Sequence, residues 1–158
     1  QWEYACRAGT ITEWFFGNDM EETSHFGNVR DASAKKLFPE RLAIESDDRH
    51  EFTSRVRLFR ANAFGLHDMC GNVFEWCSDR YGGYSDSPED DPAGPTTGDD
   101  THVMRGGSWY IWAPGSRSAY REDASASTRG SQHGFRVVRQ VSPASPFPSA
   151  SKQAVAAP

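Results

Sequence analysis

The stretch RGGSWYIWAPGSRSAYREDASASTRGSQHGFRVVR, residues 105–139, decides the fold of this chain. Gly, Arg, Ser and aromatic residues form a frame, and three short runs of unrelated composition interrupt it, at residues 110–116, 122–128 and 130–133. The two glycines after Arg105 predict a tight turn, because a side chain would obstruct a closely packed backbone there. The segment therefore combines a scaffold with loops whose chemistry differs from it.

The composition is that of one loop-rich domain. The chain has 158 residues with 14 Gly, 9 Pro and 13% aromatic residues, which favours irregular structure packed around large rings. The net charge is −5 and the mean hydropathy −0.71. An acidic chain lacks the basic face that nucleic-acid phosphates require, so we expect no nucleic-acid partner.

The sequence leaves the cellular compartment open. It holds no run of 18 apolar residues, so we expect no membrane span, and its start lacks the charged and apolar regions of a secretory signal.

Local patterns predict little regular structure. We expect a helix over residues 1–8 that ends at Gly9, a short strand over 11–16 and one helical turn over 32–36. Residues 84–101 are expected to form an acidic surface loop, and residues 140–158 a disordered or loosely packed tail. The centre of the core is predicted from the apolar residues Phe64, Leu66, Met69, Val73, Phe74 and Trp76.

Two further blocks, QWEYACRAGT at residues 1–10 and AFGLHDMCGNVFEWCSDRY at 63–81, complete a family pattern. Together with residues 105–139 they resemble the formylglycine-generating enzymes, or sulfatase-modifying factors. The resemblance implies an α+β fold, a C-type lectin-like variant that is loop-rich, with short antiparallel sheets and little helix. It places the family domain at residues 1–139, with the N-terminal part of that domain absent.

The same resemblance bears on catalysis. An active oxidase of the family carries two cysteines after the GGS turn that bind copper, and a gap-free alignment puts these positions at Ile111 and Ser116. Copper(I) in such a site needs soft thiolate ligands, and neither residue provides one. We therefore expect no copper and favour a non-enzymatic role.

The three cysteines are expected to be free. The resemblance implies a disulfide from Cys6 to the final strand, but Val137 and Val138 stand where its partner would be needed, so Cys6 is predicted to be a buried thiol. Cys70 and Cys77 lie outside zinc-site spacing.

The resemblance also implies two structural calcium sites, which would pin irregular loops through oxygen ligands. In the first, the side chains of Asn28 and Asp48 act with the carbonyl groups of Val29 and His50. In the second, Asn72, Val73 and Glu75 of the GNVFEW motif act together. The alternative for the first set is that Asn28 caps a turn and Asp48 faces solvent.

The runs that depart from the frame indicate a binding surface, because loops on a fixed scaffold set specificity. The resemblance extends to the variable proteins of diversity-generating retroelements, so we expect a protein or carbohydrate ligand. Two alternatives stay open: Trp112 folds back into the core, and Arg117 and Arg121 pair internally instead of holding an anionic group. The expected ligand-binding residues are Tyr110, Ile111, Trp112, Ser116, Arg117, Arg121, Glu122, Asp123, Gln132 and His133.

Three hypotheses for function follow. The first is a non-catalytic binding module, possible in either a fixed or a diversified form. The second is part of an oxidoreductase of the same family, either the formylglycine-generating oxidase or an iron-dependent sulfoxide synthase; no histidine triad for the latter stands in this chain. The third is a degenerate oxidase that recruits Cys70 or Cys77.

Overall fold

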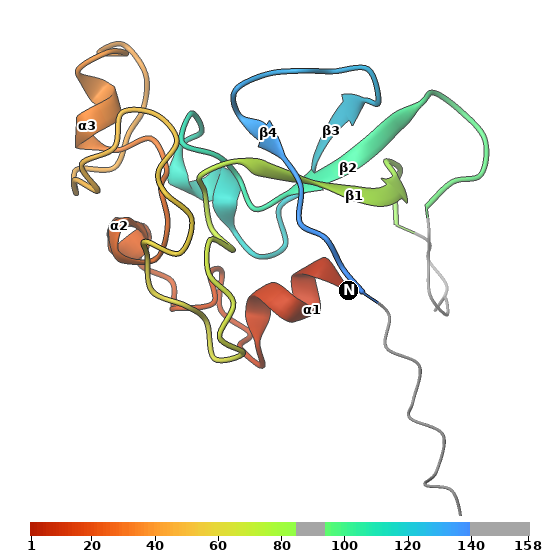
Figure 1. The fold of residues 1–158 in the computed structure, drawn as a ribbon, viewed down its shortest axis with the longest axis horizontal. Helices are drawn as coiled ribbons and strands as arrows, with labels where there is room; N and C mark the ends of the chain where they lie inside the picture. The colour runs from red at the N-terminus through yellow and green to blue at the C-terminus, as the bar shows by residue number, and fades with distance from the viewer. Residues whose placement is uncertain (85–93, 140–158) are drawn as a thin grey trace, which may run out of the picture.

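The computed structural model of the protein describes residues 1–84 and 94–139. The tail predicted at residues 140–158 lies outside the described residues, as does the middle of the acidic loop predicted at 84–101. Figure 1 shows a small sheet at one side of the view, α2 and α3 at the other, and α1 beneath. Long loops make up most of the ribbon between these elements.

The helices are short, as the sequence predicts. Helix α1 spans Trp2–Arg7 and ends where Ala8 adopts a left-handed conformation, with φ of 46°, and donates its N–H to the carbonyl of Tyr4. Gly9 follows with φ of 97°, so the end predicted at Gly9 is confirmed to within one residue. The remaining helices are η1 (Met20–Glu22), α2 (Thr23–Phe26), α3 (Ala32–Lys35) and η2 (Ala113–Ser116).

Asp31 begins α3. Its carboxylate accepts hydrogen bonds from the backbone N–H groups of Ser33 and Ala34, which have no partner inside the helix. The helical turn predicted at residues 32–36 is thus confirmed.

The sheet is mixed, which corrects the expectation of antiparallel pairing alone. Its strands are β1 (Phe74–Arg80), β2 (Thr101–Arg105), β3 (Glu122–Ser125) and β4 (His133–Gly134), in the order β3-β2-β1-β4. β2 pairs antiparallel with β1 and β3, whereas β4 runs parallel to β1 through Phe74 and Glu75. Along the chain, β2 and β3 lie between β1 and β4, and this long connection allows the parallel pairing that a tight hairpin would forbid.

Residues 11–16 form a turn and not the predicted strand. The backbone groups of Trp14 and Gly17 bond to each other in both directions, at 3.0 and 3.2 Å. This closes the chain on itself before a strand can extend. Trp14 and Phe15 are thereby placed in the core, where both are buried.

The core draws on more of the chain than the predicted segment. Its buried cluster is made of Cys6, Trp14, Phe15, Val29, Ile44, Met69, Cys70 and Ala113. Of the residues expected at its centre, Met69 and Phe74 are buried, while Phe64 is 51% exposed and packs on Tyr4 at the surface. The prediction for Phe64 was wrong because the first helix presents Cys6, and not Tyr4, to the interior.

No helix among the described residues is long and apolar enough to cross a membrane.

Candidate functional site

The GGS turn joins β2 to the loop that carries the two copper-site positions. Gly106 and Gly107 have φ of 89° and 76°, a region that side chains rarely adopt. A Cβ on Gly107 would lie 2.7 Å from the Cβ of Ser116, so the turn packs directly against η2. The glycines are therefore needed for both backbone conformation and close approach.

Ser116 lies inside the molecule, with 1% of its surface exposed. Its hydroxyl accepts hydrogen bonds from the indole N–H of Trp14 and from the thiol of Cys70, both at 3.1 Å, and donates to the carbonyl of Ala113 at 2.7 Å. One donated and two accepted bonds use the full capacity of a hydroxyl. Ser116 is a structural group here, and the expectation that it contacts a ligand is not supported by its placement.

Ile111 is half-buried beside Ser116. Its side chain packs over Gly115, and its carbonyl accepts from the backbone N–H of Arg30 at 2.9 Å. Its aliphatic side chain has no atom that can coordinate a metal.

Cys70 is the thiol closest to a copper-site position, through its contact with Ser116. Burial raises its pKa to about 12, against a smaller lowering by the Ser116 hydrogen bond. Burial likewise raises the pKa of Cys6 to about 11. All three cysteines are free, so the expectation of a buried Cys6 thiol agrees with the structure. A protonated thiol is a poor ligand and nucleophile.

Tyr110 is held between segments that are distant in sequence. Phe38 and Trp109 meet its ring edge to face at 5.3 and 5.4 Å between centroids, and the guanidinium carbons of Arg30 and Arg41 lie 5.4 and 5.0 Å from the ring centre. Sequence reasoning missed these neighbours, because no local pattern connects residues 30–41 to residue 110. We call Arg30, Phe38, Arg41 and Tyr110 the Tyr110 cluster.

Trp112 and the two arginines expected at the binding surface also make contacts within the protein. Trp112 is half-buried and packs against the core cluster, so the alternative that it folds back is the one observed. Arg117 is exposed and donates to the carbonyl of Pro114. Arg121 stacks on Tyr81 and Tyr84 at 4.8 and 4.6 Å. Each of the two arginines therefore has its own contact within the protein.

The expected ligand-binding residues after Arg121 lie at the sheet and not at Tyr110. Glu122 accepts from the Tyr120 hydroxyl, and Asp123 is exposed on β3. The carbonyl of Gln132 accepts from the N–H of Phe74, and His133 lies beside Trp76, 6.2 Å between ring centroids. A cavity of about 580 Å³ opens next to His133, lined in part by Trp76, Cys77, His102 and Arg129. The predicted surface is therefore split between two places.

The first predicted calcium set has oxygen atoms that need a partner. Asn28 is fully buried and its amide donates to the carbonyl of Phe52 at 2.7 Å, while its Oδ1 is buried without a partner among the described residues. Oδ2 of Asp48 is in the same condition. Burial, followed by the charge of Asp31, raises the pKa of Asp48. Unpaired buried oxygens are costly, and a hard cation would satisfy both.

Val29 and His50, whose carbonyls complete that first set, adjoin these side chains in sequence. The backbone N–H of His50 donates to Oδ1 of Asp48 at 2.7 Å. This bond orients the carboxylate and leaves Oδ2 free. The residues present thus fit a calcium ion.

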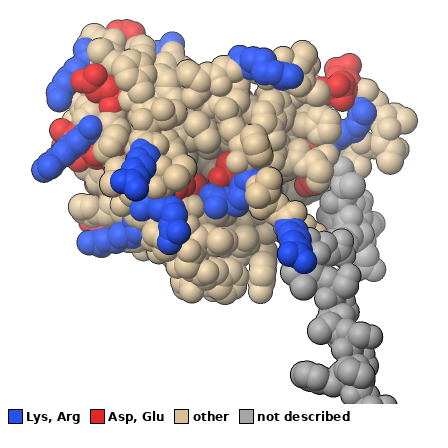
Figure 2. All heavy atoms as spheres, viewed as in Figure 1, with Lys and Arg blue, Asp and Glu red and all other residues tan. Residues whose placement is uncertain are grey.

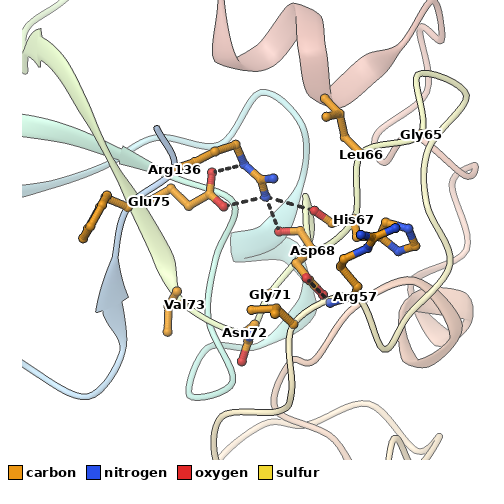
Figure 3. Close-up of a pocket in the computed structure, with 12 residues that line it drawn as sticks. Arg57, Gly65, Leu66, His67, Asp68, Gly71, Asn72, Val73, Glu75 and Arg136 are labelled. Carbon is orange, nitrogen blue, oxygen red and sulfur yellow. Dashed lines mark hydrogen bonds and ion pairs between the residues drawn. The ribbon is translucent and has the colours of Figure 1, made fainter. Parts of the chain in front are cut away.

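The second predicted calcium set does not fit, because its donors have other partners. Figure 3 shows Glu75 bonded to Arg136, and both residues line a pocket of about 450 Å³. The guanidinium of Arg136 binds both carboxylate oxygens, at 2.7 and 3.0 Å, and the indole N–H of Trp2 donates to Oε2 at 2.7 Å. Oδ1 of Asn72 accepts from the N–H of Ser54, and Val73 is half-buried. The charge of Glu75 is balanced by an arginine.

Sequence reasoning missed further contacts that Arg136 makes in the Glu75 pocket. Arg136 donates to the carbonyls of His67 and Asp68 (Figure 3), which ties the last frame arginine to the 63–81 block. Arg136 is therefore paired within the protein, and Arg105 behaves alike through Glu3 and the carbonyl of Ser118. Within residues 1–84 and 94–139, no group of three or more His, Cys, Asp or Glu side chains is arranged so that together they could hold a metal ion.

The chain belongs to the Sulfatase-modifying factor enzyme 1-like domain family, whose profile matches residues 1–141. It is 38% identical over 111 residues to the formylglycine-generating enzyme of Streptomyces coelicolor, covering 69% of this chain and 34% of that protein. It is 33% identical over 140 residues to the mouse formylglycine-generating enzyme, covering 82% and 36%.

Solved structures show the same scaffold. Treponema denticola variable protein 1 aligns with a TM-score of 0.69 and 28% identity over 85% of this chain and 43% of that one. PvdO from Pseudomonas aeruginosa aligns with a TM-score of 0.67 and 31% identity over 85% and 48%. The chain spans about a third of the length of the two enzymes and less than half of each solved chain.

Proposed function

We propose that this chain is a non-catalytic binding module on the sulfatase-modifying-factor scaffold, with a protein or carbohydrate as its ligand. The observation that carries the proposal is the state of Ser116. At one position where the family's oxidase has a copper ligand, this chain has a hydroxyl that is buried and saturated with hydrogen bonds. At the other it has the apolar side chain of Ile111.

The binding surface lies at the Tyr110 end of the molecule. Tyr110 and its cationic neighbours present aromatic and charged groups together, which is typical of residues that anchor a partner. The likeness to a protein named as variable supports a receptor surface on this scaffold, diversified or fixed. The fold in this proposal is the C-type lectin-like variant, supported by the short helices and the small sheet.

Calcium has a structural part in the proposal. Asn28 and Asp48 hold the ion through Oδ1 and Oδ2, with the carbonyls of Val29 and His50. The ion supplies positive charge where Asp31 and Asp48 lie close together in a buried region. We do not extend the proposal to Asn72, Val73 and Glu75, because Arg136 already balances Glu75.

The alternative is an oxidoreductase role within a longer protein of the same family. A CxPxR-type peptide incubated with copper(I), oxygen and the chain tests both, with the Streptomyces coelicolor enzyme as the positive control. We expect no conversion of the peptide cysteine above the rate without protein. Conversion by the chain would overturn the binding-module proposal.

The variant Cys70→Ser separates the remaining hypotheses. If the chain converts the peptide and Cys70→Ser does not, the thiol beside Ser116 is the recruited ligand and the degenerate-oxidase hypothesis is correct. If both proteins convert it, the chemistry uses another group. The variant Cys77→Ser tests the other candidate thiol of that hypothesis, on β1, in the same way.

A further inference from the structure

The Tyr110 cluster holds two cations that form no ion pair with residues 1–84 or 94–139. The guanidinium carbons of Arg30 and Arg41 lie 5.4 and 5.0 Å from the centre of the same ring. The arginine ion pairs formed by the described residues involve Arg7, Arg80, Arg105 and Arg136. Arg30 and Arg41 are absent from that group, so among the described residues neither of these two charges, both near the same ring, is balanced by a carboxylate.

Arg30 is the more unusual of the two. Only 8% of its surface is exposed, and arginines at such positions are normally paired with a carboxylate. Burial, followed by the charge of Arg41, lowers the pKa of Arg30. The adjacent carboxylate of Asp31 points elsewhere, since it accepts from the N–H groups of Ser33, Ala34 and Asp48.

The fold positions both cations. The backbone of Arg30 is tied on two sides, because its N–H donates to the carbonyl of Ile111 at 2.9 Å and its carbonyl accepts from the N–H of Ile44 at 3.1 Å. A turn brings Arg41 into place, with its N–H bonded to the carbonyl of Phe38 at 3.0 Å. The site is thus held in advance by backbone bonds from three segments.

Hydrogen-bond donors remain available on both groups. Nε of Arg30 donates to the carbonyl of Tyr110 at 2.9 Å, but its two Nη atoms have no acceptor among the described residues, and neither does the side chain of Arg41. Stacking uses the face of a guanidinium and leaves its N–H groups free in the plane. Arg41 is exposed, so solutes can reach the pair.

We propose that Arg30 and Arg41 form a binding site for a phosphate or sulfate group, free or carried by the ligand of the module. This inference rests on the proposed binding function and names the chemistry of its ligand. Two guanidinium groups match a tetrahedral oxyanion in charge and in number of donors, whereas one carboxylate would neutralise only one of them.

Titration with inorganic phosphate, inorganic sulfate and acetate, each at constant ionic strength in sodium chloride, tests the site by calorimetry and by the NMR signals of the Tyr110 ring. We expect saturable binding of phosphate and sulfate that moves the Tyr110 signals, and much weaker binding of acetate. The variant Arg41→Gln should weaken phosphate binding by about tenfold or more. Arg55→Gln, which removes the same charge at another exposed arginine, should leave it unchanged.

Equal phosphate binding by the wild type, Arg41→Gln and Arg55→Gln would overturn the site. If acetate binds as tightly as phosphate, the assignment of the site to a tetrahedral oxyanion is wrong. Arg30→Lys, which keeps the charge but loses the planar fork, should also weaken binding, and its circular dichroism spectrum shows whether the fold is kept. Equal affinity of Arg30→Lys with an unchanged spectrum would count against Arg30.

Glucose 6-phosphate and glucose distinguish the two sources of the oxyanion. Tighter binding of glucose 6-phosphate than of inorganic phosphate assigns the site to an esterified ligand, and the reverse assigns it to the free ion. Failure of the proposed function is recognised separately, because peptide oxidation would refute the module without changing phosphate affinity. Absence of phosphate binding would refute this inference and leave the module intact.

Discussion

Ser116 and Cys70 define the interior of the site at the scale of single residues. The Cys70 thiol donates to the Ser116 hydroxyl at 3.1 Å, and this hydroxyl donates in turn to the carbonyl of Ala113. Such a network rigidifies a core when every member is satisfied. The position that serves a metal in the family's oxidase therefore contributes to packing in this chain.

The Cys70 thiol should lose its proton, and become reactive, only at high pH. Its pKa is raised from 9.0 to about 12, so the folded state keeps a proton that the unfolded state loses, and the free energy of unfolding should fall as pH rises from about 9 to about 12. Urea unfolding at pH 8 and pH 10 measures the fall. The variant Cys70→Ala should show a smaller fall, and an equal one would contradict the assignment.

Glu75 should be important for stability, because its loss leaves the partly buried Arg136 without a counter-ion among the described residues and Trp2 without a charged acceptor. We expect Glu75→Gln to lower the free energy of unfolding by about 2–3 kcal/mol, measured by urea denaturation. Glu51→Gln changes an exposed carboxylate and should cost little. If the two variants have equal stability, the ion pair contributes nothing measurable.

At the scale of elements, the GGS turn fixes how β2 meets η2. Gly107 is constrained twice, by its φ of 76° and by the nearby Cβ of Ser116. Gly9 has a similar constraint of conformation, with φ of 97°, but faces open space. A comparison of alanine variants at these two glycines therefore separates the cost of the backbone conformation from the cost of steric overlap.

Gly107→Ala should be more destabilising than Gly9→Ala. A left-handed alanine costs about 1–2 kcal/mol, and at residue 107 the overlap with Ser116 adds about 1–3 kcal/mol. Thermal unfolding of both variants gives the comparison. Equal losses of stability would mean that the turn can move away from η2.

The elements also show where sequence patterns were sufficient. Local chemistry explains where α1 ends and where α3 begins. Helix α1 ends at a left-handed residue before Gly9, and α3 begins at the capping carboxylate of Asp31. The turn at residues 14–17 and the parallel pairing of β4 do not, because each depends on backbone bonds and distant partners that no local period reveals. Phe64 was misplaced for the same reason.

At the scale of the whole molecule, calcium should hold the loops around Asn28 and Asp48 together. We expect a chelator to lower the melting temperature by about 5 °C or more, because an ion bound to the folded state alone stabilises it by mass action. Differential scanning calorimetry with and without calcium measures the effect. An unchanged curve would remove calcium from the proposal.

Asp48→Asn provides the matched test of location. It removes the charge that the ion requires while keeping the size of the side chain, so the response to chelator should disappear. Asp123→Asn, on the exposed face of β3, should retain it. Retention by Asp48→Asn would place the ion elsewhere.

Positive and negative side chains are mixed on the surface, so the electrostatic field there does not have one uniform sign. Figure 2 shows Lys and Arg side chains distributed among Asp and Glu over the viewed face. Recognition of an anion would then depend on the local pair Arg30 and Arg41 and not on the net charge of −5.

The sequence by itself determined the family, the short helices and the lack of a thiol at Ile111 and Ser116, because residue identity and local spacing carry that information. Tertiary structure alone decided which predicted site residues meet. It joined Glu75 to Arg136, left Asn28 and Asp48 with unpaired oxygens, and placed Arg30 and Arg41 on Tyr110. The physical reason is that such contacts join segments tens of residues apart, whose approach is set by the packing of long loops.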